Sequence, residues 1–351
     1  MINVLGLALY GPMAASTRVR MGQFVPGLAQ HGIHLEVSAL LGDDYLRKRF
    51  HGGFLPLASM ARAGIQRIEQ LQRAREIDLA MLYCELLPFM PGQLERKLIR
   101  QPYIYDLDDA FYLRYTLGRK RILSGILGGK FDHLMAGAAA VTAGNSTLAE
   151  YASRHNPSVD LLPTVVDTNR YEPVPKQKSG KLTVGWIGSP STSTYLPELV
   201  APLAELGAEG EVDFVVVGGK APSIPHVNIR EVPWSEASEV ELINTFDIGV
   251  MPMPDDEWAR GKCAYKLIQY MACGLPVIGS AVGANKDVVT AECGHMVSGS
   301  AQWLQAFRQL RDNPKLRASM GEAGRARVEE HYSLHVTLPK LATLIHRLAG
   351  K

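Results

Sequence analysis

The chain contains 351 residues, which is enough for two α/β domains at the usual size of roughly 100–200 residues per domain. Its hydrophobic content of 46% and charged content of 21% are ordinary for a globular protein and exclude a disordered chain. With a formal net charge of only +2, we expect no nucleic-acid partner. No run of about 18 apolar residues is present, so the sequence predicts no transmembrane helix.

The chain begins with MINVLGLALYG, which lacks the charged lead of a secretory signal and predicts a first β-strand. Gly11 opens the loop that follows this strand, and the loop is expected to contain Ser16, Thr17, Arg18 and Arg20. Loops at the carboxyl ends of strands line the ligand crevice in open α/β sheets. Arg18 is therefore a candidate for contacting an acceptor substrate or a phosphate group.

Three acids, Asp106, Asp108 and Asp109, follow directly after the predicted strand PYIY at residues 102–105. Such a density of acids at a strand end is unlike a core strand and indicates either a binding site or metal ligands. Metal binding would require further ligands for Asp106 and Asp108 in a geometry that the sequence does not show. Asp106 and Asp109 are candidate substrate contacts, and no metal is expected.

Residues 114–135 alternate basic side chains with Leu, Ile and Phe, and the basic ones are Arg114, Arg119, Lys120, Arg121 and Lys130. Such a pattern is typical of segments that rest on an anionic membrane surface. A solvated helix face fits the same pattern, and both interpretations stay open.

Four cysteines, Cys84, Cys263, Cys273 and Cys293, show neither CxxC pairing nor zinc-ligand spacing. Free thiols in a reducing compartment are the simplest interpretation, so we expect a cytoplasmic protein, with peripheral contact to the inner face of the membrane as the alternative that residues 114–135 offer. The motifs HExxH, GxSxG and GxGxxG are absent, which argues against a zinc hydrolase, a serine hydrolase of that type and a dinucleotide-binding enzyme.

A polar, proline-bearing stretch at residues 172–180 predicts a linker between two domains. Apolar runs without alternation, such as DFVVVGG and DIGVMPM, are typical of parallel sheets that are covered on both faces. In the run VGWIGSPST, Gly188 and Ser189 follow a predicted strand. Backbone N–H groups and hydroxyls in such a loop are suited to surrounding a phosphate.

Residues 255–280 are the most informative run, DDEWARGKCAYKLIQYMACGLPVIGS. Gly261 allows close approach of the backbone to a ligand at a predicted helix start, and Lys262 and Lys266 are predicted to share one face of that helix. Gln269 continues this face. Two lysines at a helix N-terminus are suited to binding phosphate, and the surrounding residues are too apolar for a freely solvated helix. We therefore predict that the lysines face a cleft.

This run resembles the donor-binding segment of GT-B glycosyltransferases of family 4, the retaining enzymes called glycosyl transferases group 1. Three further stretches agree in the expected order: LYGPMAASTRVRMGQFVPGLAQHGIHLEV, LLPTVVDTNRYEP and VGWIGSPST. The resemblance implies an α/β GT-B fold, in which two Rossmann-like parallel-sheet domains face each other across a cleft. The expected domains are an acceptor-binding domain at 1–172, a nucleotide-sugar-binding domain at 173–332, and a helix at 333–351 that returns to the first domain.

The resemblance also implies roles for residues outside the lysine pair. Trp234 lies where the family holds the nucleotide base, although it can equally cap the core, and Asn285 lies in the loop that approaches the donor. Two glutamates are common in this segment of the family, but this chain has Gly261 and Gln269 instead. The amide of Gln269 can still hold a ribose diol. Asp255, Asp256 and Glu257 are then candidates for contacting sugar hydroxyls, and a solvated acidic loop is the open alternative.

These expectations combine into a retaining, metal-independent, hexosyltransferase-like enzyme without a cofactor, which moves a sugar from a nucleotide-sugar to an acceptor hydroxyl. The acceptor is expected to be a glycan or lipid-linked molecule of polysaccharide, glycolipid or other glycoconjugate synthesis. The predicted site comprises the catalytic residues Asp106, Lys262 and Lys266, the donor-binding residues Gly188, Ser189, Trp234, Asp255, Gly261, Gln269 and Asn285, and the acceptor-binding residues Arg18 and Asp109. A non-catalytic nucleotide-sugar-binding protein and a GT-B-type sugar-nucleotide epimerase are the open alternatives.

Overall fold

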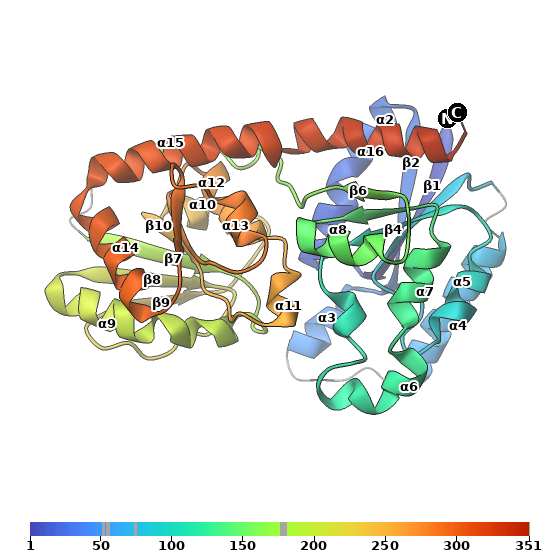
Figure 1. Ribbon diagram of the computed structural model, residues 1–351, viewed down its shortest axis with the longest axis horizontal. Coiled ribbons are helices and arrows are strands. Elements are labelled where there is room, and N and C mark those ends of the chain that lie inside the picture. Colours follow the sequence, from blue (N-terminus) through green and yellow to red (C-terminus); the bar gives the residue numbers. More distant parts are fainter. Residues whose placement is uncertain (51–52, 54–56, 74–75, 176–180, 351) are drawn as a thin grey trace. The chain divides into compact units, whose positions relative to one another are not determined.

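The computed structural model describes residues 1–50, 53, 57–73, 76–175 and 181–350. The chain forms two compact units, each with its own sheet (Figure 1). The first unit comprises Met1–Thr164, Gly261–Cys263 and Thr337–Lys351, and the second comprises Val165–Arg260 and Ala264–Val336. The division therefore falls before the predicted linker at 172–180, of which residues 176–180 lie outside the described ones.

The first unit is built on a six-stranded sheet in the order β2-β1-β3-β4-β5-β6, with every neighbouring pair parallel. Its strands are β1 (Ile2–Tyr10), β2 (Ile33–Leu41), β3 (Leu79–Tyr83), β4 (Tyr103–Leu107), β5 (Ala140–Ala143) and β6 (Val159–Leu161). β1 lies inside the sheet, where Val4 is opposite Leu35 on one side and Leu79 on the other. Its apolar run is buried almost throughout because helices cover both faces of a parallel sheet.

Helices of the first unit connect these strands. They are α1 (Ala15–Arg20), α2 (Val25–Gln30), α3 (Asp43–Phe50), α4 (Leu57–Arg73), α5 (Gly92–Leu98), α6 (Ser124–Leu127), α7 (Lys130–Gly137) and α8 (Ser146–Ser153), with the short 3₁₀ helices η1 (Gly22–Phe24), η2 (Phe111–Leu113) and η3 (Gly118–Leu123). The last helix, α16 (Leu334–Leu348), belongs to the first unit from Thr337 onward.

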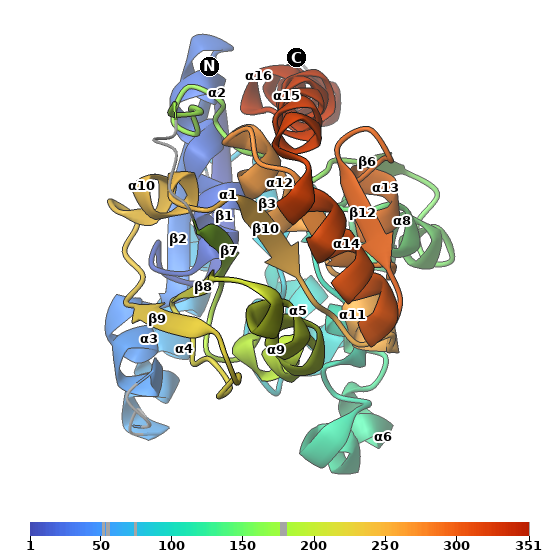
Figure 2. The same ribbon diagram turned by 90° about the vertical axis from the view of Figure 1, so that its left-hand side faces the viewer.

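The second unit holds a second six-stranded parallel sheet in the order β12-β11-β10-β7-β8-β9 (Figure 2). Its strands are β7 (Leu182–Ile187), β8 (Val212–Val217), β9 (Asn228–Val232), β10 (Ile248–Met251), β11 (Val277–Ser280) and β12 (Gly294–Val297). Read from β9, the strands follow the third-second-first-fourth-fifth-sixth order of the doubly wound Rossmann sheet. The predicted α/β class with parallel sheets is confirmed.

Helices of the second unit pack on both faces of this sheet. They are α9 (Val200–Glu209), α10 (Glu239–Asn244), α11 (Glu257–Arg260), α12 (Tyr265–Ala272), α13 (Asn285–Val288), α14 (Ser300–Asp312) and α15 (Pro314–His331), with the 3₁₀ helix η4 (Ser193–Leu199). One apolar core centres on α12 and the other on Trp186, α9 and α14, so the sheet is buried from both sides.

The strand order places a switch point in each sheet, between β1 and β3 in the first unit and between β7 and β10 in the second. Ligands of open α/β sheets bind at such points, outside the carboxyl ends of the strands. Among the described residues, no helix combines the length and the apolar character needed to cross a membrane. All four cysteines are buried free thiols.

Candidate functional site

The carboxyl edge of the second sheet brings Gly188 and Lys266 together. Gly188 directly follows β7, and Lys266 is the second residue of α12. A Cβ atom at Gly188 would lie 2.8 Å from Cε of Lys266 and 2.5 Å from the ring of Trp186, so a larger residue would have to displace them. The ammonium of Lys266 lies 5.6 Å from the centre of the buried Trp186 ring, within cation–π range.

Gly218, at the end of β8, connects Trp234 to the same edge. Its φ of +77° is one that side chains rarely adopt, and a Cβ there would lie 2.9 Å from Cβ of Trp234 and against the carbonyl oxygen of Gly188. The edge between β10, β7 and β8 is therefore a surface of bare backbone with a lysine and two tryptophans beside it. We call Gly188, Lys266, Trp186, Gly218 and Trp234 the switch-point surface.

Ser189 lies in a tight hydroxyl-rich turn next to Gly188. Its hydroxyl is 2.8 Å from the hydroxyl of Ser191, and its N–H donates to Oγ1 of Thr192 at 3.3 Å. The hydroxyl of Thr192 donates back to the carbonyl oxygen of Ser189 at 3.1 Å. The turn therefore holds three hydroxyls beside Gly188 of the switch-point surface.

The predicted lysine pair does not share a helix face. α12 begins only at Tyr265, after Ala264 in a left-handed conformation with φ of 52°, so Lys262 lies outside the helix. The ammonium of Lys262 is instead 3.2 Å from Oδ2 of Asp109 in the first unit, to which Lys262 itself belongs. The assumption that spacing alone places both lysines on one helix is therefore wrong.

The segment Gly261–Cys263 is fastened to the first unit by Asn145. The side-chain amide of Asn145 donates to the carbonyl oxygens of Gly261 at 3.0 Å and of Lys262 at 3.1 Å. A Cβ at Gly261 would lie 2.7 Å from Cβ of Ala110, so this glycine serves a close backbone approach to the first unit. The thiol of Cys263 donates to the carbonyl oxygen of Asp108. Because burial raises the pKa of this thiol, it stays protonated and is not suited to act as a nucleophile.

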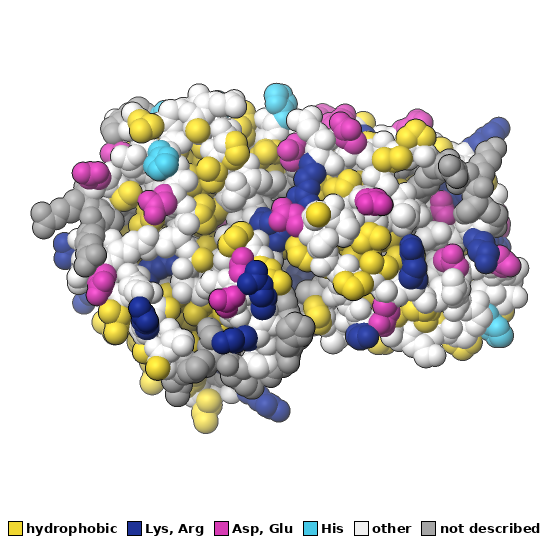
Figure 3. Space-filling model, turned by 180° about the vertical axis from the view of Figure 1, so that it is seen from behind, with side chains coloured by type: hydrophobic (Ala, Val, Ile, Leu, Met, Phe, Trp, Pro, Cys, Tyr) yellow, Lys and Arg dark blue, Asp and Glu magenta, His cyan; other side chains and the backbone are white. Residues whose placement is uncertain are grey.

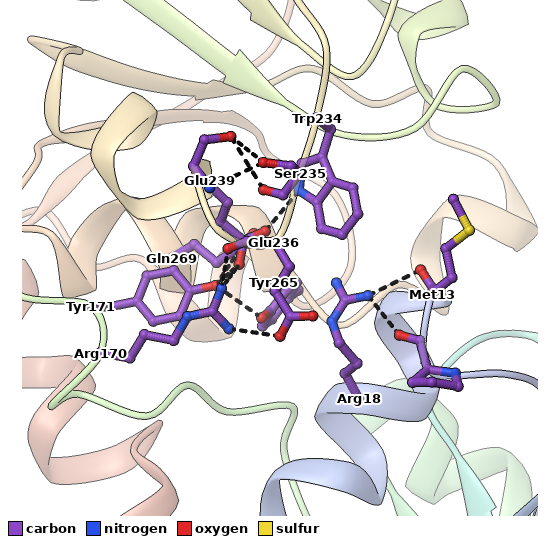
Figure 4. Close-up of polar contacts among 12 residues, drawn as sticks. Met13, Arg18, Arg170, Tyr171, Trp234, Ser235, Glu236, Glu239, Tyr265 and Gln269 are labelled. Carbon is purple, nitrogen blue, oxygen red and sulfur yellow. Dashed lines mark hydrogen bonds and ion pairs between the residues drawn. The ribbon is translucent and has the colours of Figure 1, made fainter. Parts of the chain in front are cut away.

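Gln269 is occupied by a buried network of the second unit (Figure 4). Its amide donates to the hydroxyl of Tyr171 at 2.9 Å, and that hydroxyl donates to Glu239. The indole N–H of Trp234 donates to the other oxygen of Glu239 at 2.9 Å, while Arg170 lies 3.2 Å from Glu239. Burial first, and then Tyr265 and Glu239, raise the pKa of Tyr171. Trp234 is thus held in a fixed orientation, and Gln269 acts on it through Tyr171 and Glu239.

Two further predicted donor contacts have other partners. Asn285 is fully buried and donates to the carbonyl oxygen of Ser280 at 2.9 Å, which braces the turn after β11. Asp255 is exposed and accepts a hydrogen bond from Nε of Arg260 at 2.7 Å, which lowers the pKa of Asp255. Neither geometry brings these residues to the switch-point surface, although Asp255 keeps its exposed carboxylate.

Asp106 is not placed to contact a sugar, which corrects its predicted catalytic role. Its carboxylate is buried and accepts hydrogen bonds from Nε of Arg20 at 2.8 Å and from Nη2 of Arg20 at 2.5 Å. The hydroxyl of Thr142 donates to it at 2.5 Å. The carboxylate therefore ties the first helix to β4 and β5 inside the first unit.

Asp108 is the acid at this strand end that the sequence reasoning did not select. It is half-buried, and the hydroxyl of Tyr83 donates to its Oδ1 at 2.7 Å. Burial raises the pKa of Asp108 to about 7, against the lowering effect of Arg20. Side chains alternate along a strand, so Asp106 and Asp108 are expected on the same side of the sheet. Only Asp108 lies beyond the end of β4, and this position is the sequence signal that favours it over Asp106 as a site residue.

Arg18 turns back onto its own loop. Nη1 donates to the carbonyl oxygens of Pro12 at 2.9 Å and of Met13 at 3.0 Å (Figure 4). The half-buried guanidinium therefore braces the loop after β1, at the carboxyl edge where the sequence predicted an acceptor contact.

A cavity of about 530 Å³ opens at the opposite, amino edge of the second sheet, lined among others by Thr183, Asp213 and Arg230. Helix and strand ends that bind ligands in α/β sheets lie at the carboxyl edge, so we assign this cavity no role in the predicted chemistry. Within the described residues, no group of three His, Cys, Asp or Glu side chains is arranged to hold a metal ion.

Comparison with known proteins agrees with this architecture. Residues 182–313 match the family described as glycosyl transferases group 1. A sucrose-phosphate synthase from Thermosynechococcus elongatus superposes with a TM-score of 0.72 at 16% identity, over 99% of both chains. HepE of Anabaena, solved with UDP and glucose, superposes with a TM-score of 0.69 at 14% identity, over 98% of this chain and 99% of that one.

The chain has the GT-B fold. Its second unit carries the glycosyl transferases group 1 segment. The chain is also 35% identical, over 217 residues, to the GDP-mannose-dependent monoacylated alpha-(1-6)-phosphatidylinositol monomannoside mannosyltransferase of Corynebacterium glutamicum. That match covers 54% of this chain and 56% of the relative, so it spans about half the length of both proteins.

In this GT-B protein, the group 1 segment contains the whole switch-point surface, whereas Asp106, Asp109 and Arg18 lie outside the segment. The structure brings Gly188, Ser189, Lys266 and Trp234 to one edge of the second sheet and brings Gly261, Lys262 and Asp109 together in the first unit. Gln269 and Asn285 are buried and belong neither to the switch-point surface nor to the group around Lys262 and Asp109.

The GT-B protein also carries a buried ionic cluster below the carboxyl end of β3. The ammonium of Lys130 lies 2.6 Å from Glu85 and 2.8 Å from Glu95, and neither carboxylate is exposed. Burial acts to raise the pKa of Glu85, but Arg114 and Lys130 hold it below its usual value. Burial raises the pKa of Glu95 to about 7, because Lys130 is shared and the N–H groups of Leu86 and Leu87 do not offset the desolvation.

We expect this cluster to make the protein less stable as the pH rises from about 4.5 to about 7. Glu95 has a folded pKa above its unfolded value, so its protonated form stabilises the fold at low pH and this contribution is lost through that window. The shift corresponds to about 3 kcal/mol, at 1.36 kcal/mol per pKa unit. Urea unfolding at several pH values in this range, followed by circular dichroism, should show that the free energy of unfolding falls less steeply with pH in Glu95→Gln than in the wild type. An unchanged slope in that variant would contradict the assignment, with exposed Glu150→Gln as the matched control.

Proposed function

We propose that this protein is a glycosyltransferase that moves a sugar from a nucleotide-sugar donor to an acceptor hydroxyl, with retention of configuration and without a metal. The observation that carries the proposal is the switch-point surface, where Lys266 lies over Trp186 beside the bare backbone of Gly188. This surface lies within the glycosyl transferases group 1 segment and at the edge where α/β sheets bind ligands.

The chemistry requires positive charge at the leaving group. When the bond between sugar and nucleotide diphosphate breaks, negative charge develops on the diphosphate, and preorganised cations and N–H donors lower the barrier. We assign this role to Lys266, together with the N-terminus of α12, whose first turn has no side-chain cap in the part of the chain that the structure describes. Lys262 is the second proposed cation, and Ser189 and Gly188 supply hydroxyl and backbone contacts to a phosphate.

The remaining roles follow from exposure and orientation. Trp234 is the proposed platform for the nucleotide base, because Glu239 fixes its indole next to Gly218. Asp255 is the proposed contact for sugar hydroxyls, since its carboxylate is exposed. On the acceptor side we propose Asp109, Arg18 and, in place of the buried Asp106, the half-buried carboxylate of Asp108.

The relatives narrow the substrates that should be tried first. The Corynebacterium relative is named for GDP-mannose and a phosphatidylinositol mannoside, and HepE was solved with UDP and glucose. We therefore propose a hexose donor on UDP or GDP and a glycolipid or other lipid-linked acceptor, with cell-envelope polysaccharide as the wider class.

The proposal is tested by thermal unfolding with saturating UDP, GDP, dTDP, ADP and CMP in turn. At about 100 times its dissociation constant, a ligand adds about 2.7 kcal/mol, so one nucleotide should raise the midpoint by several degrees. The shift should vanish in Lys266→Ala and persist in Lys315→Ala, an exposed lysine of the same unit. If no nucleotide shifts the wild-type protein, the donor site is wrong.

Incubation with the matching nucleotide-sugar then separates the three candidate functions. Transfer or slow hydrolysis supports the glycosyltransferase, whereas conversion of the nucleotide-sugar into its epimer without acceptor supports an epimerase. Binding without any turnover supports a non-catalytic binding protein.

A further inference from the structure

The connection between β4 and α7 ends in an exposed apolar tip. Ile122 in η3 is 89% exposed, Ile126 in α6 is 71% exposed, and Leu117 just before η3 is 45% exposed. Isoleucine and leucine side chains are rarely so exposed in a group within one short segment. We call residues 117–126 the tip, and both views of the ribbon show α6 at an extremity of the first unit (Figures 1 and 2).

Basic side chains share the outer side of the tip. Arg119 and Arg121 are exposed, and Arg119 precedes Ile122 by three residues in a 3₁₀ helix, where residues three apart eclipse one another. The sequence from Ala110 to Phe131 contains no Asp or Glu, so the charge of this segment has one sign. Figure 3 shows hydrophobic and basic side chains together at the lower end of the first unit.

The residues that flank the tip on both sides are packed, so the exposed residues of the tip are not part of an unravelled core. Leu127 is buried, and the ring of Tyr115 lies 6.0 Å from that of Phe131. The ammonium of Lys120 lies 5.2 Å from the centre of the Tyr115 ring and 5.6 Å from that of Phe89. Phe89 is itself 54% exposed and extends the apolar surface beside the tip.

The base of the tip is tied to the carboxyl edge of the first sheet. Tyr115 donates from its hydroxyl to Glu85, just beyond β3, at 2.8 Å, and the N–H of Phe89 donates to the same hydroxyl. Arg114 lies 3.3 Å from Glu85 and 3.5 Å from the hydroxyl of Tyr10 at the end of β1. The tip therefore projects from the switch-point edge of the first unit, where acceptor loops are expected.

We propose that the tip and Phe89 form a docking surface for an anionic lipid bilayer. Exposed isoleucines in a segment whose charged side chains are all basic match a membrane interface, where apolar side chains enter the acyl boundary and Arg side chains meet acidic headgroups. The core of an interface with another protein is depleted of charged residues, whereas exposed arginines lie next to Ile122 in the sequence of the tip. If the protein transfers a sugar as proposed above, the acceptor class is then a lipid held in that bilayer, presented at the edge from which the tip projects.

The test is flotation of the full-length protein with vesicles of phosphatidylcholine alone and of phosphatidylcholine with about one-third phosphatidylglycerol. We expect binding to the anionic vesicles, and weaker binding when salt is raised from about 0.1 M to about 1 M, which shortens the Debye length from ~10 Å to ~3 Å. Ile122→Ser with Ile126→Ser should reduce the partition coefficient about 100-fold, on the order of tenfold for each isoleucine removed from the interface. Arg119→Gln with Arg121→Gln should reduce it about tenfold or more, and only on anionic vesicles.

Matched controls in the same unit are Leu161→Ser, an apolar side chain that is 56% exposed outside the tip, and Arg154→Gln, an exposed arginine that directly follows α8. Both should bind like the wild type. The proposal is overturned if the wild type does not float with anionic vesicles, or if the tip variants bind as tightly as the controls. The nucleotide-induced thermal shift of each variant is measured in parallel, so a failed donor site and a failed docking surface give different results.

Discussion

Replacing Arg20 with alanine is expected to lower the free energy of unfolding of the first unit by about 3–5 kcal/mol. The substitution removes the partner of Asp106, whose carboxylate has no exposed surface and would be left as an uncompensated buried charge. It also removes the hydrogen bond from Arg20 to the carbonyl oxygen of Leu162 at 2.9 Å, beside β6. Both losses fall on one residue, so the effect should be among the largest of any single substitution.

The measurement is urea unfolding followed by two signals. Trp186, Trp234, Trp258 and Trp303 are the four tryptophans of the chain, and all lie in the second unit, so their fluorescence reports on that unit. Circular dichroism at a helical wavelength follows both units. In Arg20→Ala, the circular dichroism signal should begin to fall at a lower urea concentration than in the wild type, while the transition seen by fluorescence stays in place.

Two further variants separate a charge effect from loss of packing. Arg18→Ala removes a neighbouring, half-buried arginine that donates to backbone carbonyls of its own loop, and it should cost less than about 1 kcal/mol. Adding Asp106→Asn to Arg20→Ala removes the orphaned charge and should recover part of the lost stability. A single-variant loss below about 1 kcal/mol, or a double variant no more stable than the single one, would contradict the buried ion pair.

The same pair shows which features the sequence could reveal. Parallel sheets were predictable because strands such as β1 and β8 are continuous apolar runs, and a pattern of this kind depends only on local residues. Arg20 and Asp106 are separated by 86 positions, and the local sequence around either residue does not indicate that the two form an ion pair. Asp106 therefore looked like a site residue, because a buried acid at a strand end and a catalytic one have the same local sequence.

The prediction that Lys262 and Lys266 share a helix face was wrong for a related reason. Four-residue spacing places two side chains on one face only if the helix includes both, and helix boundaries are the least reliable part of a sequence prediction. Here Asn145 holds Gly261–Cys263 in the first unit, so the helix cannot begin before Ala264. Gln269 was likewise expected at a ribose, but Tyr171, 98 positions away, occupies its amide. The position of Gly188 after a strand and that of Lys266 within a helix could be predicted, because each depends only on its own element.

Replacing Lys266 with alanine is expected to reduce kcat/KM for the cognate nucleotide-sugar by about 10²–10³-fold, the usual cost of removing one preorganised group that stabilises transition-state charge. Folding stability should change by no more than about 1 kcal/mol, because the side chain is half-buried and lies on Trp186 rather than in the core. The donor is the derivative of whichever nucleotide gives the thermal shift, and turnover is followed by release of the free nucleotide.

The kinetic pattern across three variants decides what Lys266 does. Lys266→Arg keeps the charge and should retain more activity than Lys266→Ala, whereas Lys315→Ala should leave kcat/KM unchanged. Lys262→Ala should cost less than Lys266→Ala, because the 3.2 Å ion pair with Asp109 already offsets the charge of Lys262. A fall in kcat would place part of the contribution of Lys266 in the transition state, as a leaving diphosphate requires, while a rise in KM is expected from the lost contact to the bound diphosphate that the thermal shift reports. If instead Lys266→Ala retains wild-type turnover, the switch-point surface does not carry the leaving group, and the proposed chemistry would have to be abandoned while the GT-B fold stands.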